Sequence, residues 1–151
     1  ATTTGTTSVQ TLRKNKRADG IEFKDVFGKD HADSFLLLES GRADAFVMDS
    51  SLLAGLIARS KNPADYKIAG EVLSLEPIAI MVRKDDAEFL KVVNGAIVGL
   101  IKSGEIYKLY DKWFTQPTPP TGAVLNMPMT DALKAALKNP NSKPAEDYAA
   151  K

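Results

Sequence analysis

The turn Thr4–Ser8 has the residue types of an anion-binding site. If a helix begins directly after it, the first backbone N–H groups of that helix have no intrahelical partner and lie at the positive end of the helix dipole. Gly5 allows a ligand to approach the main chain closely, and the hydroxyls of Thr6 and Thr7 can either cap the helix or bind a carboxylate. The turn therefore predicts a carboxylate-binding loop or, more simply, a well-capped helix.

His31, the single histidine of the chain, lies in a polar segment before a second expected helix. A protonated or donating imidazole at a helix start suits a carboxylate partner, although a histidine there can also be a surface capping residue. With Ser34 as nucleophile, the same segment could form a hydrolytic pair. We disfavour that hypothesis because the sequence has no nucleophile elbow and no separate oxyanion hole.

Asp49 closes an apolar segment, where an acidic side chain is costly unless it is paired or exposed. It could cap the next helix, or its carboxylate could bind an ammonium group. Helix N–H groups for one carboxylate, Asp49 for an amine and His31 for a second anionic group together describe a site for an acidic amino acid. We predict no catalytic residue, no cofactor and no metal site, since one histidine and scattered carboxylates lack ligand spacing.

The elements expected to position these residues alternate between strand and helix. Apolar segments of strand length lie at 21–24, 43–48, 66–69 and 78–83. Helical patterns lie around 9–12, 31–38 and 50–57. This alternation predicts an α/β unit with a mostly parallel sheet flanked by helices, whose ligands bind beyond the carboxyl ends of the strands. Gly5, His31 and Asp49 fall at strand-to-helix junctions, so we expect all three at that edge.

From Asp85 onwards the pattern changes to helices. A long amphipathic helix is predicted to end at Gly104, and a second helix carries Ile106 to Trp113. The apolar stripe of the long helix is wide enough to need a sheet to cover. After Thr115 the chain is rich in proline and is expected to form loops, with one short helix capped by Thr130.

The net charge limits the functional classes to which the protein could belong. Twenty Lys and Arg against nineteen Asp and Glu leave a formal net charge of +1, so no basic field points to nucleic acid. The basic cluster Arg13–Arg17 is interpreted as the solvated end of a short helix.

Only Ala1–Thr4 precede the glycine turn, and these four residues are too few for a whole buried strand. We therefore expect a truncated fragment, the C-terminal part of a longer protein.

Several motifs, in this order, resemble the second lobe of bacterial periplasmic amino-acid-binding proteins of ABC importers, the solute-binding proteins of family 3. The motifs are Gly5–Ser8, Lys29–Phe35, Leu38–Asp49, Leu52–Gly55, Glu76, Arg83–Asp86, Lys112–Phe114 and Pro119–Pro120. Within that family they are most similar to glutamate/aspartate-binding members. The resemblance covers nearly all of the chain.

The resemblance implies a periplasmic protein with the type II periplasmic-binding-protein fold. Such a protein captures glutamate or aspartate in a cleft between two lobes and delivers it to an ABC permease in the inner membrane, without chemistry on the ligand. In the family, the turn that matches Gly5, Thr6 and Thr7 helps to hold the ligand α-carboxylate. The aspartate that matches Asp49 takes the α-amino group, and the histidine that matches His31 faces the side-chain carboxylate.

The resemblance also divides the chain into three segments. Residues 1–73 would form the ligand-binding lobe 2, truncated at its N-terminus, and residues 74–114 would cross back and pack on lobe 1. Residues 115–151 would form a proline-rich tail with one short helix. The C-terminal helices then belong to the other, missing lobe, so we expect a complementary N-terminal fragment, a helix swap with a second copy, or self-association.

Two features depart from the family pattern. The segments of lobe 1 that carry the family's carboxylate-clamping arginines and serines are absent, and Glu76-Pro77 is followed by Ile78-Ala79 where relatives have an aromatic residue and a glycine. The second difference leaves the preference for the ligand side chain open. Two alternative functions remain, namely a dehydratase-type enzyme on the same fold acting on a carboxylated substrate, and the ligand-sensing domain of a receptor or kinase.

Overall fold

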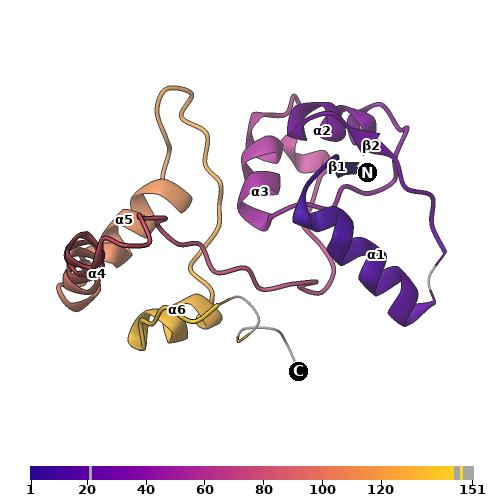
Figure 1. Cartoon of the computed structure of the whole chain (residues 1–151). Coiled ribbons are helices and arrows are strands. Elements are labelled where there is room, and N and C mark those ends of the chain that lie inside the picture. The colour runs from indigo at the N-terminus through magenta and orange to yellow at the C-terminus, as the bar shows by residue number, and fades with distance from the viewer. Residues whose placement is uncertain (21, 145–146, 148–151) are drawn as a thin grey trace. The chain divides into compact units, whose positions relative to one another are not determined.

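A computed structural model of the chain describes residues 1–20, 22–144 and 147. The chain divides into two compact units, Ala1–Ser74 and Leu75–Lys151. The first unit combines a small parallel sheet with helices, and the second consists of helices and long loops (Figure 1). The predicted mixed α/β class is therefore confirmed. Among the described residues, no helix has the length and apolar character needed to cross a membrane.

The sheet of the first unit consists of β1 (Thr2–Thr3) and β2 (Phe27–Gly28), which run parallel to each other. Ala1 also exchanges backbone hydrogen bonds with the extended segment 45–47, one of them from Val47 N to Ala1 O at 3.0 Å. Successive residues of a strand direct their backbone N–H and C=O groups to opposite sides. Ala1 is bonded to segment 45–47, whereas the next residue, Thr2, is bonded toward β2, so segment 45–47 lies along the opposite side of β1. Three extended segments therefore lie side by side, with β1 in the middle.

Three helices of the first unit each begin shortly after one of these segments. They are α1 (Thr7–Asp19) after β1, α2 (His31–Glu39) after β2 and α3 (Ser50–Arg59) after segment 45–47. A short 3-10 turn, η1 (Pro63–Asp65), follows α3. Figure 1 shows α1 starting next to β1 and running away from the sheet. The same local arrangement therefore occurs three times: an extended segment ends and a helix begins shortly after it.

Local sequence explains where α2 begins and ends. The Asp30 carboxylate accepts the Asp33 N–H at 2.8 Å, which satisfies one of the first amides of the helix. Gly41, with φ 69°, takes the left-handed conformation that commonly ends a helix. The apolar face of α2 contributes to a small core, whose buried members are Phe35, Leu37, Ala43, Phe46 and Ala54.

The second unit contains α4 (Ala87–Lys102), α5 (Glu105–Phe114) and α6 (Asp131–Lys138). The Asp86 carboxylate caps α4 by accepting the Phe89 N–H at 3.0 Å. The Thr130 hydroxyl caps α6 as predicted, since it accepts the Leu133 N–H at 3.2 Å.

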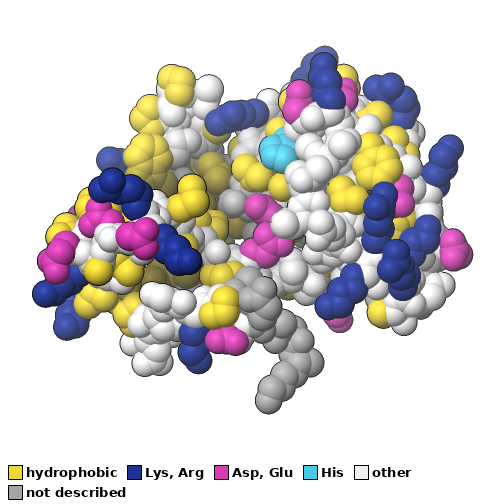
Figure 2. Space-filling model, viewed as in Figure 1, with side chains coloured by type: hydrophobic (Ala, Val, Ile, Leu, Met, Phe, Trp, Pro, Cys, Tyr) yellow, Lys and Arg dark blue, Asp and Glu magenta, His cyan; other side chains and the backbone are white. Residues whose placement is uncertain are grey.

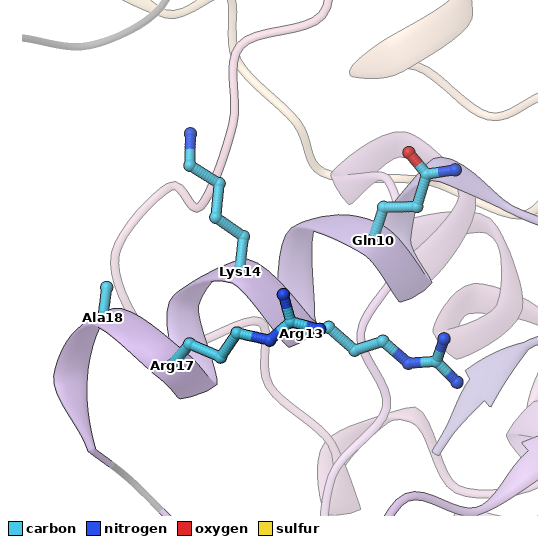
Figure 3. A pocket seen from close by; sticks show the side chains of 5 residues that line it. All are labelled: Gln10, Arg13, Lys14, Arg17 and Ala18. Atoms are coloured by element: carbon cyan, nitrogen blue, oxygen red, sulfur yellow. The ribbon is translucent and has the colours of Figure 1, made fainter.

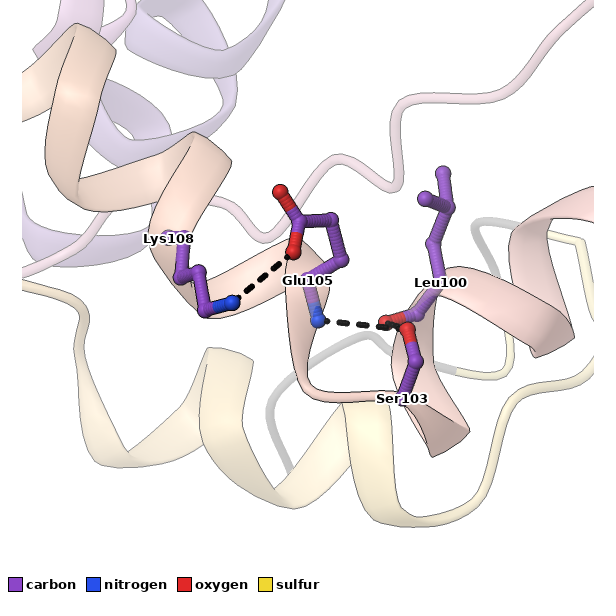
Figure 4. Close-up of polar contacts among 4 residues, drawn as sticks. All are labelled: Leu100, Ser103, Glu105 and Lys108. Carbon is purple, nitrogen blue, oxygen red and sulfur yellow. Dashed lines mark hydrogen bonds and ion pairs between the residues drawn. The ribbon is translucent and has the colours of Figure 1, made fainter.

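The turn between α4 and α5 forms a compact corner. Gly104, with φ 76°, reverses the chain, and the Ser103 hydroxyl donates to Leu100 O at 3.2 Å. Ser103 Oγ also accepts the Glu105 N–H at 3.4 Å, and the Glu105 carboxylate pairs with the Lys108 ammonium at 3.1 Å (Figure 4). Both predicted helices of this region, and the glycine between them, are confirmed.

The first predicted helix is wrong in length. It does not end before the basic cluster Arg13–Arg17 but continues through it to Asp19, followed by Gly20 with φ 63°. Lysine and arginine are good helix formers, and cations in the last turn interact favourably with the helix dipole. The cluster is therefore the C-terminal part of α1, which agrees with its interpretation as a solvated helix end, while the helix itself is longer than the pattern at 9–12 indicates.

The predicted strands are largely wrong. Ile21 lies outside the described residues, residues 22–24 form no strand, and the strand occurs at Phe27–Gly28. Residues 43–48 form no strand; the chain bends at Asp44, and only segment 45–47 pairs with Ala1.

Residues 66–69 and 78–83 form no strand either. Ile78 and Met81 are each 96% exposed, so this segment is not covered by any described part of the chain. A strand forms only where a neighbour satisfies its N–H and C=O groups, and the described residues provide no ladder for these two segments.

Candidate ligand-binding site

The candidate site is the edge of the sheet where the three extended segments end. The turn at Gly5 follows β1, Asp30 and His31 follow β2, and Asp49 follows segment 45–47. Because the three segments run parallel, their carboxyl ends lie at one edge, and the N-termini of α1, α2 and α3 lie there too. Helix N-termini at one edge produce a positive potential, which favours an anionic ligand.

The glycine turn is shaped by its own threonines. Gly5 has φ 78°, a left-handed conformation that favours glycine, and it is exposed. Thr6 occupies the N-cap position of α1 but makes no side-chain capping bond; its hydroxyl instead donates to Thr3 O at 2.8 Å. Thr7 is the first residue of α1 and is exposed. Thr6 is therefore the N-cap residue of α1 by position, without a capping bond from its side chain.

His31 is the first residue of α2 and not its cap, since the Asp30 carboxylate has that role. Its Nδ1 atom lies 2.9 Å from the Thr3 hydroxyl oxygen, so α2 and β1 are joined at the edge. The imidazole is half-buried, and Figure 2 shows it reaching the surface. The hydrolytic hypothesis does not fit this geometry, because the Ser34 hydroxyl is fully buried and bonds Thr3 and the Asp30 carbonyl.

Asp49 occupies the N-cap position of α3, yet its side chain makes no capping hydrogen bond. The residue is exposed, and its carboxylate has no hydrogen-bond or ion-pair partner in the part of the chain that the structure describes. Asp49 is therefore the N-cap residue of α3 by position, but its side chain does not cap the helix. An unpaired carboxylate at this edge is available to an ammonium group.

Sequence reasoning missed Thr3 and Gly28, and it considered Ser34 only as a disfavoured nucleophile and not as a structural residue. Thr3 is 4% exposed and joins the imidazole to the Ser34 hydroxyl, with oxygen atoms 2.9 Å apart. Gly28 lies against Ser34, because an added Cβ would lie 2.3 Å from Ser34 Oγ. A serine that bonds the carbonyl four residues earlier is a common helical pattern, but its contact with Thr3 depends on the register Thr3 to Gly28, which residue spacing does not give.

Two hollows of the described surface lie away from this edge. One, of about 570 Å³, follows α1 and is lined by Gln10, Arg13, Lys14, Arg17 and Ala18 (Figure 3). Its side chains come from one helix, and Lys14 points away from the two arginines, so nothing encloses a ligand there. Another, of about 550 Å³, lies in the second unit at Met81 to Phe89. The candidate site is therefore an open edge, and the described residues contain no cluster of three His, Cys, Asp or Glu that could hold a metal ion.

Comparisons with known proteins agree on one family. The family model for bacterial extracellular solute-binding proteins, family 3, matches residues 4–116. The chain is 48% identical over 145 residues to the L-glutamate/L-aspartate-binding protein of Pseudomonas aeruginosa, covering 96% of this chain and 48% of that protein. It is 43% identical over 141 residues to the glutamate/aspartate import solute-binding protein of Escherichia coli, covering 93% and 47%.

A more distant relative is the ABC transporter glutamine-binding protein of Bacillus subtilis, which is 30% identical over 113 residues, covering 74% of this chain and 38% of that protein. The chain thus spans about half the length of the two glutamate/aspartate-binding relatives.

Proposed function

The chain belongs to family 3 of the bacterial extracellular solute-binding proteins, and on that premise we propose that it forms part of the glutamate/aspartate-binding component of an ABC importer. We propose a periplasmic location, an ABC permease of the inner membrane as partner, and no chemistry on the ligand. The names of the relatives support this proposal, since the proteins of Pseudomonas aeruginosa and Escherichia coli, at 48% and 43% identity, are named for glutamate and aspartate.

The observation that carries the proposal is the pairing of an anion-attracting edge with an unpaired carboxylate. Three helix N-termini and the exposed turn at Gly5 favour a carboxylate, whereas the free Asp49 side chain favours an ammonium group. These are the two charges of an α-amino acid. His31, half-buried at the same edge, supplies a third contact suited to a second carboxylate, which glutamate and aspartate have and glutamine lacks.

We assign roles on this basis. The backbone at Gly5, Thr6 and Thr7 would hold the α-carboxylate, Asp49 the α-ammonium group, and His31 the side-chain carboxylate. An open edge contacts only one side of a small ligand, whereas binding sites usually bury most of the ligand surface. We propose that residues 1–73 form one lobe and that the half of the relatives outside the matched region corresponds to the lobe that closes the site.

The remaining segments fit the same proposal. Residues 74–114 would cross to the other lobe, which would cover the exposed apolar side chains of this region, and residues 115–151 would form a tail. Ile78, Ile80, Met81, Phe89 and Val92 are all more than half exposed. Apolar surface of this kind favours association, so we propose that the chain by itself pairs with a complementary fragment or self-associates.

Calorimetric titration tests the function. L-glutamate, L-aspartate and L-glutamine are titrated into the chain alone and into the chain mixed with the half of the Pseudomonas aeruginosa relative that it does not match. We expect both acidic amino acids to bind the mixture more tightly than glutamine, and more tightly than they bind the chain alone. If neither acid binds the mixture while the two fragments associate, the proposed ligand is wrong.

A further inference from the structure

The side chains of Thr3, His31 and Ser34 form one continuous hydrogen-bonded chain. Ser34 Oγ lies 2.8 Å from Asp30 O and 2.9 Å from Thr3 Oγ1, and Thr3 Oγ1 lies 2.9 Å from His31 Nδ1. Both hydroxyls are buried, with Ser34 0% and Thr3 4% exposed. Water does not reach the two hydroxyls, so these three contacts alone determine to which atom each hydroxyl donates its proton.

Counting protons gives the direction of every bond. A hydroxyl donates one proton, and a backbone carbonyl can only accept. The proton of Ser34 is therefore donated to Asp30 O, so the bond between the two hydroxyls must be donated by Thr3. Thr3 has then used its single proton and can only accept from His31. It follows that Nδ1 of His31 carries a hydrogen.

We propose that Thr3 and Ser34 are positioning residues that hold neutral His31 as its Nδ1–H tautomer, so that Nε2 meets the ligand and binds a carboxylate only after taking up a proton. The part that concerns the ligand rests on the proposed function. In the neutral ring, Nε2 is a lone-pair acceptor and repels a carboxylate oxygen. A side-chain amide, as in glutamine, can donate to the neutral ring directly.

The carboxylates at the start of the helix of His31 are bonded to backbone N–H groups. On its own helix, the Asp30 and Asp33 carboxylates accept the backbone N–H groups of Asp33 and Lys29, at 2.8 and 3.0 Å. Strands β1 and β2 contain no titratable residue, and the first turn of α1 contains no acidic residue. No ion pair joins His31 to any residue that the structure describes.

His31 is the first residue of α2, where the positive end of the helix dipole favours an anionic ligand. A bound carboxylate favours the protonated imidazole, because the two groups carry opposite charges. If binding of an acidic amino acid takes up one proton, its affinity falls by up to about tenfold per pH unit, whereas the affinity for glutamine stays constant. The edge therefore becomes less selective for the acids as the pH rises.

The tautomer can be observed without any ligand. His31 is the single histidine, so ¹⁵N NMR of the ligand-free chain at pH 8, above the ordinary histidine pKa of about 6.5, reports one imidazole. We expect Nδ1 to carry the hydrogen and Nε2 to be the bare nitrogen. A hydrogen on Nε2 would overturn the proposal.

Two substitutions test the positioning role. Thr3→Val removes the acceptor at nearly constant volume and should release the ring to the Nε2–H tautomer, while Thr3→Ser keeps the hydroxyl and should keep Nδ1–H. If Thr3→Val does not fold, Ser34→Ala serves the same purpose, since the freed Thr3 proton can then be donated to Nδ1. An unchanged tautomer in Thr3→Val or in Ser34→Ala would mean that the hydroxyls do not determine which ring nitrogen carries the hydrogen.

Proton uptake is measured separately by calorimetry at pH 8, in two buffers of different ionisation enthalpy. L-glutamate and L-glutamine are titrated into the chain mixed with the unmatched half of the Pseudomonas aeruginosa relative. We expect uptake approaching one proton for glutamate and none for glutamine. Glutamate binding without uptake would overturn the assignment of Nε2 to the carboxylate. Failure of both amino acids to bind, with Nδ1–H observed, would contradict the proposed function and support the positioning role alone.

Discussion

Asp30 and Asp49 occupy the same position at the start of two helices, but their carboxylates do different things. Asp30 accepts the Asp33 N–H at 2.8 Å, whereas Asp49 makes no side-chain bond to its helix. A residue that satisfies a helix amide stabilises the fold, while an unpaired exposed carboxylate contributes little to stability and is available for a ligand. This difference separates a structural acid from a binding acid.

Substituting each aspartate by alanine should therefore have opposite consequences. Asp30→Ala is expected to lower the free energy of unfolding by about 1 kcal/mol, because the cap bond is lost. Asp49→Ala should change it by less than about 0.5 kcal/mol, yet weaken glutamate binding about 10- to 100-fold through the loss of a charged hydrogen bond. Urea denaturation and calorimetry measure the two effects. Equal destabilisation by both variants would make Asp49 an ordinary cap.

Residue types in the sequence were enough to nominate Gly5, His31 and Asp49, because each stands at a junction between an extended segment and a helix. They were not enough to find Thr3, which lies within a run of threonines and has no distinguishing pattern. Its role depends on the parallel register that brings Thr3 opposite Gly28. Register is a long-range property, so local spacing cannot predict it.

At the scale of elements, the close approach of α2 to β2 positions the imidazole. Gly28 makes this approach possible, since an added Cβ would lie 2.3 Å from Ser34 Oγ and 2.5 Å from Ser34 N. A backbone atom at that distance cannot move aside cheaply, so the start of α2 would have to shift. The shift would separate Ser34 from Thr3.

Gly28→Ala is thus expected to lower the free energy of unfolding by about 1–3 kcal/mol and to release His31 from its Nδ1–H tautomer. The matched control is Gly55→Ala in α3, where an added Cβ meets nothing within 4 Å. Alanine is the better helix former, so that variant should gain about 0.5–1 kcal/mol. Urea denaturation compares them, and a neutral effect of Gly28→Ala would show that α2 is not held by this contact.

Helices were easier to predict than strands for a physical reason. A helix satisfies its own backbone and shows its ends through residues such as Thr130 and Gly104, both of which formed as expected. A strand depends on a neighbour, so an apolar segment such as 78–83 remains without strand structure where the described chain offers none.

At the scale of the whole molecule, the second unit presents an unusually large amount of apolar side chain to solvent. Ile78 and Met81 are each 96% exposed, and Val92 is 65% exposed. In a monomeric protein such surface is rarely left uncovered. We therefore expect the chain alone to associate.

Light scattering should give a mass above the 16.3 kDa of one chain, rising with concentration. The double substitution Ile78→Glu with Met81→Glu should reduce the association, because it charges the apolar segment, whereas Lys84→Glu, which removes no apolar surface, should not. A constant mass of one chain at all concentrations would contradict this prediction.

The central claim is that an acidic amino acid binds at the edge formed by the turn at Gly5, His31 and Asp49. The most direct test follows the ¹⁵N signals of His31 while L-glutamate is added, at pH 8, to the chain mixed with the unmatched half of the Pseudomonas aeruginosa relative. We predict that both imidazole nitrogens move to the positions of an imidazolium as the site fills, and that L-glutamine leaves the ring neutral. An imidazole that does not respond while calorimetry shows saturation with glutamate would place the ligand elsewhere and contradict the account.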